Sequence, residues 1–216
     1  MHIKKNDFVE IEYTGKVQGG DIFDTNIKED AKKIELKIEP KPLVICIGQG
    51  MILPAIDDFL TGKPVGEYSL ELKAEKAFGL RKREMIKILS LNVFRNSDRY
   101  PQPGMVFSFD NMLGKVTSVS GGRVTVDFNN PVAGKDVHYK LIVKKIIEDS
   151  HEKVKALMSA FWGKDVPFKL ENNKIVIETE KNFAKFFDMF KDKFKEILNL
   201  ELDIKEKIEK KEDKKD

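Results

Sequence analysis

Apolar residues occupy every second position over residues 9–13, 34–38 and 68–72, and charged or polar residues fill the positions between them. A period of two is typical of half-buried antiparallel strands. Residues 51–60 follow Gly48-Gln49-Gly50 and stop before Gly62, a length that suits one short helix. The pattern therefore predicts an antiparallel sheet wrapped around one short helix.

The middle of the chain has a different character. A turn-rich stretch with Pro101 and Pro103 leads into apolar positions over residues 105–109, 116–119 and 124–128. Gly121-Gly122 separates the last two of these segments, as expected for a hairpin turn. We predict a small all-β domain here.

Strand character returns over residues 139–143, after which the period changes to that of helices. Asp149 with Glu152 three residues later resembles a capping box at a helix start. Asn172-Asn173 lies between two apolar runs as a hairpin turn. One aromatic stripe then predicts a second helix, with Phe183, Phe186, Phe187, Phe190, Phe194 and Ile197 on a single face.

Together these patterns predict an α+β protein of several parts. A discontinuous domain spans residues 1–83 and 129–149, the inserted small all-β domain spans 84–128, and a C-terminal α+β domain spans 150–204. Residues 205–216 are almost wholly charged and form a tail that buries too little surface to fold alone.

Composition and charge narrow the function classes. With 41% hydrophobic and 35% charged residues the chain reads as a soluble globular protein, and 39 basic against 36 acidic residues give no indication of nucleic-acid binding. The N-terminus lacks a signal-peptide core, and apolar runs such as residues 43–47 are too short to span a bilayer. Cys46 is the single cysteine, which excludes an internal disulfide and favours a small buried residue. We expect a cytoplasmic protein without a membrane partner.

The usual catalytic residues are nearly absent. His2, His138 and His151 are scattered, and none lies in a metal-ligand pattern. Gly48-Gln49-Gly50 lacks the Lys and Ser or Thr of a phosphate-binding loop. We therefore expect neither a metal nor a cofactor.

Several short motifs follow one another in a fixed order, namely Tyr13-Thr14-Gly15, Phe23-Asp24-Thr25, Pro42-Leu43, Ile47-Gly48, residues 51–57 and Ala77-Phe78-Gly79. This order resembles that of the FKBP-type peptidyl-prolyl cis-trans isomerases. Residues 129–135, Asn-Asn-Pro-Val-Ala-Gly-Lys, resemble the Asn-His-Pro-Leu-Ala-Gly-Lys stretch of the SlyD-like branch, in which a domain is inserted into the flap near the active site. With its C-terminal extension, the chain resembles the long archaeal FKBP type.

The resemblance implies an apolar pocket between the sheet and the helix, and an isomerase that needs no cofactor. Carried over by position, the lining is Tyr13, Phe23, Asp24, Leu43, Ile52, Leu53, Ile56, Phe78 and Tyr139. Ile56 stands where many relatives have tryptophan and Phe78 where many have tyrosine, which weakens the expectation of affinity for macrolide drugs. Taken singly, each of these side chains also fits a core role, and Asp24 fits a turn carboxylate.

The inserted segment is rich in apolar side chains for its size. The candidates for binding unfolded polypeptides are Leu89, Leu91, Val93, Phe94, Tyr100, Met105, Phe107 and Met112. Met and aromatic side chains suit adaptable contacts, although the same residues also fit the module's own core. Unfolded or proline-containing polypeptides are thus the expected partners.

Three further hypotheses come from the remaining patterns. The surplus of the aromatic stripe, with Phe161 and Trp162, is a candidate homodimer interface in the C-terminal domain. A holdase that has lost its isomerase activity is the main alternative function. A nucleic-acid binder that uses basic residues such as Arg95 and Arg99 is disfavoured, since no recognition motif accompanies them.

Overall fold

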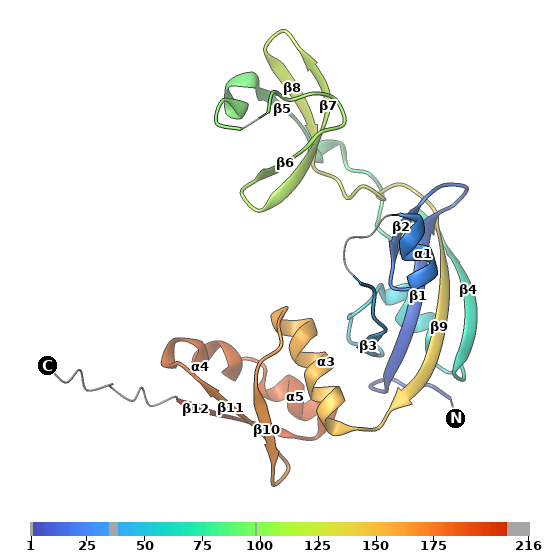
Figure 1. Cartoon of the computed structure of the whole chain (residues 1–216), viewed down its shortest axis with the longest axis vertical. Coiled ribbons are helices and arrows are strands. Elements are labelled where there is room, and N and C mark those ends of the chain that lie inside the picture. Colours follow the sequence, from blue (N-terminus) through green and yellow to red (C-terminus); the bar gives the residue numbers. More distant parts are fainter. Residues whose placement is uncertain (1, 35–38, 98, 207–216) are drawn as a thin grey trace, which may run out of the picture. The chain divides into compact units, whose positions relative to one another are not determined.

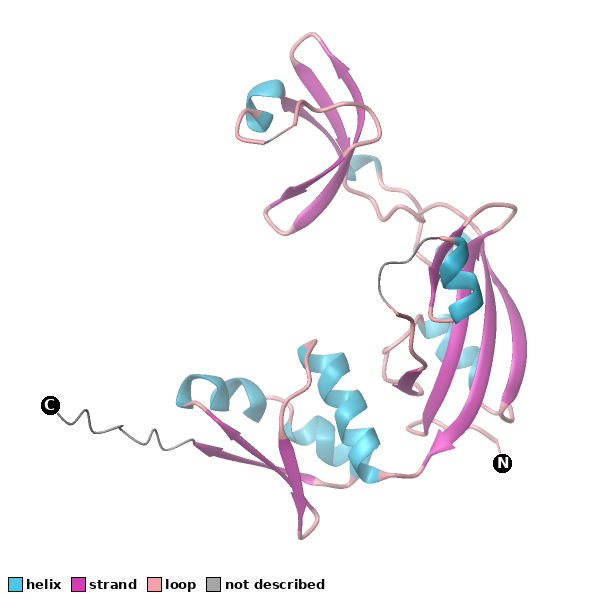
Figure 2. Cartoon of the chain, in the orientation of Figure 1, coloured by secondary structure: helices cyan, strands magenta, loops and turns pink. Residues whose placement is uncertain are grey.

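The computed structural model describes residues 2–34, 39–97 and 99–206. The chain forms two compact units, one of residues 1–13, 26–68 and 141–216 and the other of residues 14–25 and 69–140. The helices and strands of each unit are drawn in Figures 1 and 2. No helix among the described residues has both the length and the apolar character needed to cross a membrane.

The largest sheet has five strands: β1 (Phe8–Val17), β2 (Ile22–Thr25), β3 (Leu43–Cys46), β4 (Gly66–Leu72) and β9 (Val137–Ile147). Their order is β2-β1-β9-β4, and β3 also pairs with β1. Both the β1–β2 and the β1–β3 ladders are antiparallel. The predicted α+β class is confirmed, and β1 and β4 coincide with two of the three alternating segments. Residues 35–38 of the third segment lie outside the described residues.

Two helices accompany this sheet in the first unit. Helix α2 (Pro54–Leu60) corresponds to the predicted helix but begins later than residue 51, because Leu53 has a non-helical ψ of 130° and Pro54 occupies the first turn. Helix α1 (Lys28–Lys33) was not predicted, since a single buried residue, Ala31, leaves no periodic pattern.

A four-stranded sheet with its own core forms the inserted segment, and we call it the insert sheet. It comprises β5 (Ile86–Ser90), β6 (Val106–Phe109), β7 (Met112–Ser120) and β8 (Arg123–Asp127) in the order β5-β8-β7-β6. Phe94 packs with Val116, Val124 and Val126 in its core. The predicted Gly121-Gly122 turn joins β7 to β8, and both glycines have positive φ, at 54° and 74°. Short 3₁₀ turns at Ala74–Lys76, Arg83–Met85 and Leu91–Phe94 complete the unit.

The C-terminal region begins with α3 (Ser150–Trp162), whose N-cap Asp149 accepts a hydrogen bond from the N–H of Glu152 at 2.8 Å. Strands β10 (Phe168–Glu171) and β11 (Lys174–Thr179) form the predicted hairpin about Asn172-Asn173. Strand β12 (Glu201–Glu206) pairs with β11 in parallel, so Lys205 and Glu206 of the predicted tail lie in a strand. Residues 207–216 lie outside the described residues.

The prediction of one helix along the aromatic stripe was wrong. The stripe is divided between α4 (Lys181–Asp188) and α5 (Lys191–Leu198), with Met189 and Phe190 at the break. The break leaves Phe194 fully buried on α5, while Met189 is 79% exposed. Phe190 still fits the helical spacing, so periodicity alone could not reveal the break.

One hydrophobic core joins the C-terminal region to the end of the large sheet within the first unit. Phe8 of β1, Cys46 of β3 and Ile147 of β9 pack in the same cluster as Leu157 of α3 and Phe194 of α5. Cys46 is the buried residue that the sequence predicted, and burial raises the pKa of its thiol to about 12. This thiol therefore stays protonated and acts as a small apolar side chain.

Candidate functional site

Three aromatic candidates meet in the second unit. The ring of Phe23, on β2, makes edge-to-face contacts with Phe78 at a centroid distance of 5.4 Å and with Tyr139 of β9 at 5.9 Å. Tyr139 is 4% exposed, whereas Phe23 and Phe78 are partly exposed. Edge-to-face pairs stabilise a fixed ring arrangement by about 0.5–1.5 kcal/mol each. The cluster is thus a preformed apolar surface.

Gly15 of β1 makes room for this cluster. A Cβ atom at this position would lie 2.6 Å from Cζ of Phe23 and 3.0 Å from Cε1 of Tyr139. Any larger residue would displace the rings that rest on the β1 backbone. Gly15 belongs to the Tyr13-Thr14-Gly15 motif, yet it was not among the predicted site residues.

Asp24 and Tyr139 interact electrostatically. Asp24 follows Phe23 on β2 and pairs across the ladder with Gly15. Burial raises the pKa of the Tyr139 hydroxyl to about 12, and the nearby Asp24 carboxylate adds to the increase. The tyrosine therefore remains a neutral hydrogen-bonding group at any physiological pH.

The remaining candidates belong to the first unit. Tyr13 lies on β1, and Leu43, which is 40% exposed, opens β3 opposite Ile11. Ile52 and Leu53 form the segment just before α2, where Leu53 is the N-cap residue. Ile56 is fully buried in the first turn of α2. The candidates thus fall into two groups, one in each unit.

Asn26 holds the backbone around Tyr13. Its side-chain oxygen accepts a hydrogen bond from the N–H of Tyr13 at 2.6 Å, and its amide group donates to the carbonyls of Ile11 and Lys41 at 3.0 and 3.2 Å. Since Lys41 is two residues before Leu43, this single side chain fixes the β3 entrance relative to β1. Asn26 was not among the predicted site residues, although it directly follows the Phe23-Asp24-Thr25 motif.

Asp57 of α2 has a comparable role at the loop before the helix. It is 4% exposed, and its Oδ2 accepts a hydrogen bond from the N–H of Gly50 at 3.2 Å, while Oδ1 has no hydrogen-bond partner among the described residues. Burial raises the pKa of this carboxyl above its usual range, against the effect of hydrogen bonds from the Gly48 and Gly50 backbone. The loop that carries Ile52 is thus anchored by a poorly solvated carboxylate.

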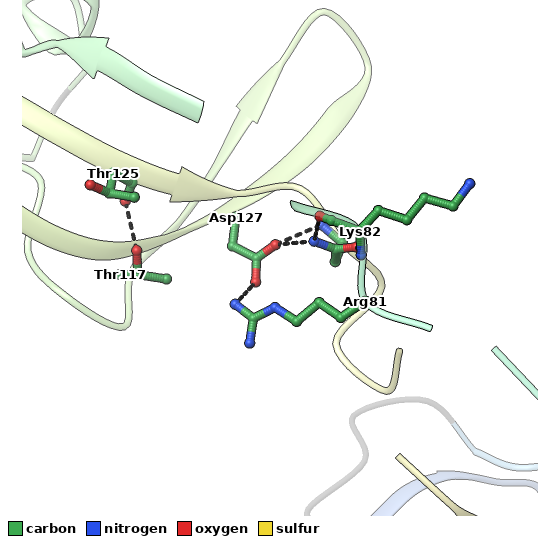
Figure 3. Close-up of polar contacts among 6 residues, drawn as sticks. Arg81, Lys82, Thr117, Thr125 and Asp127 are labelled. Carbon is green, nitrogen blue, oxygen red and sulfur yellow. Dashed lines mark hydrogen bonds and ion pairs between the residues drawn. The ribbon is translucent and has the colours of Figure 1, made fainter. Parts of the chain in front are cut away.

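A polar network closes the base of the insert sheet (Figure 3). Asp127, at the end of β8, forms an ion pair with Arg81 and accepts hydrogen bonds from the Asn129 side chain at 2.7 Å and backbone at 2.9 Å. Partial burial acts to raise the pKa of Asp127, but the Asn129 hydrogen bonds and the Arg81 guanidinium hold it below the usual range. Nearby, the N–H of Gly134 donates to the carbonyl of Gly79 at 2.8 Å, next to Phe78. Thr117 donates to the Thr125 carbonyl at 3.2 Å farther up the sheet (Figure 3).

Comparison with known proteins identifies the family. The model described as FKBP-type peptidyl-prolyl cis-trans isomerase matches residues 1–91. The "Short-type peptidyl-prolyl cis-trans isomerase" of Methanocaldococcus jannaschii is 30% identical over 148 residues, which cover 67% of this chain and 94% of that protein. The chain belongs to the FKBP-type peptidyl-prolyl cis-trans isomerases. The predicted enzyme class is confirmed.

Bacterial members of the family are also similar to this chain. The FKBP-type 16 kDa isomerase of Escherichia coli is 29% identical over 49% of this chain and 74% of its own length. The FKBP-type isomerase SlyD of Treponema pallidum is 29% identical over 73% of this chain and 86% of its own length. A second model, described as FKBP26, IF domain, matches residues 87–132, which include most of the insert sheet. This FKBP-type isomerase therefore acts on proline-containing polypeptides and carries an IF domain.

The insert candidates of this FKBP-type isomerase divide by exposure. Phe94 is buried in the core of the insert sheet, and Leu89, Leu91 and Phe107 pack against it. Met105 is partly buried. Val93, Tyr100 and Met112 are 55%, 62% and 46% exposed.

Three further apolar residues of the insert sheet are exposed but were not predicted as binding residues, namely Ile88, Val106 and Leu113. Ile88 and Val106 stand next to Leu89 and Phe107, which pack against the core, so alternation places both on the opposite face of their strands.

Proposed function

We propose that this FKBP-type isomerase is also a folding chaperone that binds unfolded polypeptides through the insert sheet. The observation that carries the proposal is the group of large apolar side chains on its surface, with Ile88, Val106 and Leu113 at 67%, 58% and 69% exposure. Exposed apolar residues gathered on one small sheet are typical of interaction surfaces.

The edges of the insert sheet suit an extended ligand. Strands β5 and β6 lie at the two ends of the strand order, and within the described residues neither pairs with a second strand. Their outer backbone groups can hydrogen-bond an added strand of any sequence, while Val106 and Met112 beside the β6 edge supply apolar contacts. An unfolded polypeptide offers both unpaired backbone groups and exposed apolar side chains.

The candidate site residues fit a reaction that requires no bond to be made or hydrolysed. The barrier to rotation of the prolyl amide, roughly 18–20 kcal/mol, comes from its partial double bond. A dry apolar surface that binds the twisted amide better than either planar form lowers this barrier. We assign this role to the aromatic cluster of Phe23, Phe78 and Tyr139, with Asp24 at its edge, and to Tyr13, Leu43, Ile52 and Leu53 in the first unit. Ile56 is fully buried, so we assign it a supporting role within α2.

Capture by the insert raises the effective concentration of a client's prolines at the isomerase residues. The test compares catalysis of a proline-limited refolding protein with catalysis of a proline tetrapeptide. We expect the double variant Val106→Ser, Leu113→Ser to lower the ratio of the two rates severalfold. Lys115→Ser, which alters the position paired with Val106, is the matched control and should keep the ratio. An unchanged ratio in the double variant would contradict capture by this face.

We further propose a homodimer formed through the C-terminal region. Phe161 and Trp162 pack against Phe190 and Phe194, so the exposed members of the aromatic stripe are Phe183 and Phe186, at 49% and 44% exposure. Met189, which is 79% exposed, adds a third apolar side chain at the break between α4 and α5. An apolar patch of this kind can pair with its copy across a two-fold axis.

Sedimentation as a function of concentration tests this interface. Phe186→Ser with Met189→Ser should shift the equilibrium towards the monomer, whereas Lys185→Ser on the exposed part of the same helix should not. A dimer that survives the double variant unchanged excludes this patch.

We also propose the cytoplasm as the site of action and membership of the long archaeal branch. The lone thiol of Cys46 is buried and suits a reducing compartment. The match to the short-type relative covers 67% of this chain and 94% of that protein, and the additional length of this chain supports the subgroup. Fractionation of cells that express the protein would test the compartment.

A further inference from the structure

A groove of about 660 Å³ lies between β3 and α3 in the first unit. One wall carries residues 41–45 and Met51, and the other carries Ala156, Ser159 and Ala160 of α3. Its volume is within the range of about 300–1,000 Å³ that holds ligands of several hundred daltons. A short stretch of polypeptide fits this volume.

The β3 wall presents an open strand edge. The N–H of Ile47 donates to the carbonyl of Asp7 at 2.9 Å, and Ile45 and Leu43 continue the same ladder with β1. Because backbone groups alternate along a strand, Val44 and Cys46 direct theirs away from β1. The N–H of Cys46 accordingly donates to Sδ of Met51 at 3.1 Å.

Val44 is therefore left with an N–H and a carbonyl that face the groove. Within the described residues no strand pairs with this side of β3. An extended polypeptide that lies beside such a residue can accept a hydrogen bond from its N–H and donate one to its carbonyl.

The charges at the groove do not select a strongly charged ligand. Lys155 pairs with Asp165 at 3.3 Å, and Glu10 pairs with Lys145 at 3.6 Å. Lys41 and Glu152 add one charge of each sign. The apolar floor and near-neutral rim therefore favour contact with backbone and apolar side chains.

The groove is continuous with the isomerase residues proposed above. Leu43 lines the groove and is itself a candidate for the isomerisation site, and Met51 directly precedes Ile52. A chain whose proline contacts Leu43 can thus continue along β3 without leaving the surface of the first unit.

We propose that this groove binds the client segment next to the isomerised proline, as an added strand on β3 with α3 as its second wall. This inference rests on the proposed roles of Leu43 and Ile52 in isomerisation. The C-terminal region then contributes directly to substrate binding. It explains why α3 faces the groove with the small side chains of Ala156 and Ala160, which let a chain approach.

The experiment compares kcat/KM for a proline tetrapeptide with kcat/KM for two longer peptides. Each longer peptide adds about six residues, roughly 20 Å when extended, on one side of the proline. The wild-type protein should show a severalfold gain with one of them, expressed mainly in KM. Val44→Pro removes the N–H that faces the groove without removing a hydrogen bond to β1, and Ala160→Trp fills the groove from an exposed position on α3. Both should lower the gain towards one.

Val44→Ala keeps the N–H and Ala160→Ser keeps the space, so these matched variants should retain the gain. Wild-type protein without any gain, or a gain that persists in both Val44→Pro and Ala160→Trp, overturns the groove as a binding site. The tetrapeptide is too short to reach along the groove, so its turnover tests only the isomerase residues. If the groove proposal is wrong, tetrapeptide turnover is unchanged and only the gain with longer peptides is absent. If the isomerase residues are wrongly assigned, their substitution leaves tetrapeptide turnover unchanged.

Discussion

The side chain of Asn129 hydrogen-bonds both backbone groups of Lys82. The N–H of Lys82 donates to Oδ1 at 2.8 Å, and Nδ2 donates to the Lys82 carbonyl at 2.9 Å. Nδ2 also donates to Asp127 at 2.7 Å. An amide is suited to this position because it is both donor and acceptor, and it ties together the two chain segments at the base of the insert sheet.

Asn129→Asp tests this connection. The carboxylate cannot donate and would lie beside Asp127, so we expect faster hydrogen exchange at the Lys82 amide and a loss of about 1–3 kcal/mol in local opening free energy. Asn129→Ala loses these donated hydrogen bonds and also the acceptor of the Lys82 N–H, but it adds no charge beside Asp127. Acid should therefore restore protection of the Lys82 amide in the Asp variant only, because the protonated carboxyl can donate and no longer repels Asp127. Exchange equal to that of the wild type in both would refute the connection.

Gly15→Ala should disturb the aromatic cluster through a steric clash. The added Cβ would lie 2.6 Å from the Phe23 ring, and overpacking of this kind costs about 1–3 kcal/mol. We expect a severalfold lower kcat/KM on a proline tetrapeptide and a lower midpoint of urea unfolding. Gly20→Ala is the matched control, since its Cβ comes no closer than 3.3 Å to Val17. Full activity in Gly15→Ala would mean that the ring positions are unimportant for turnover.

Phe78→Ala removes the partner that holds the Phe23 ring edge-to-face. We expect a severalfold loss of tetrapeptide kcat/KM with little change in the circular dichroism spectrum, because Phe78 is only partly buried. Phe78→Tyr keeps the ring and should retain most of the activity. Wild-type turnover in Phe78→Ala would remove this residue from the proposed site.

The buried carboxyl of Asp57 predicts a pH dependence of stability. Its pKa is raised in the folded protein, so the native state holds this proton to higher pH than the unfolded chain does. The contribution is therefore complete below the unfolded pKa and is lost as pH rises through the folded pKa. Asp57→Asn should lack this decline, which urea unfolding detects as the pH rises above about 4, the pKa of an ordinary Asp. Asp21→Asn, an exposed position, should follow the wild type.

Sequence patterns predicted those strands, helix starts and turns that have a local signal. Strict alternation located β1 and β4, and the Asp149 cap and the Asn172-Asn173 turn located the start of α3 and the β10–β11 hairpin. Helix α1 was missed because its residues are mostly polar and leave little periodic signal. Strand β12 was missed although Leu202 and Ile204 alternate with charged residues, because this alternation is short and runs into the charged C-terminal segment. The break between α4 and α5 was missed because Phe190 preserves the helical spacing.

The sequence predicted the aromatic side chains of the candidate site but not the residues that hold them in place. Motif order selected Phe23, Phe78 and Tyr139, whose rings meet in the structure. Asn26 acts by hydrogen-bonding the backbone, and Gly15 acts by having no side chain. Neither effect produces a pattern that a single sequence reveals. Exposure in the insert depends on which face of each strand meets Phe94, so Val106 and Leu113 became visible only once the register was known.

The core that α3 shares with Phe8, Cys46 and Ile147 has a consequence for how the molecule opens. If α3 separated from the sheet, the apolar surfaces of both would be exposed to water. We therefore expect β3 and α3 to behave as one cooperative unit in native-state hydrogen exchange. Cleavage of the chain at Asp149 would then yield a destabilised fragment in place of an autonomous catalytic core.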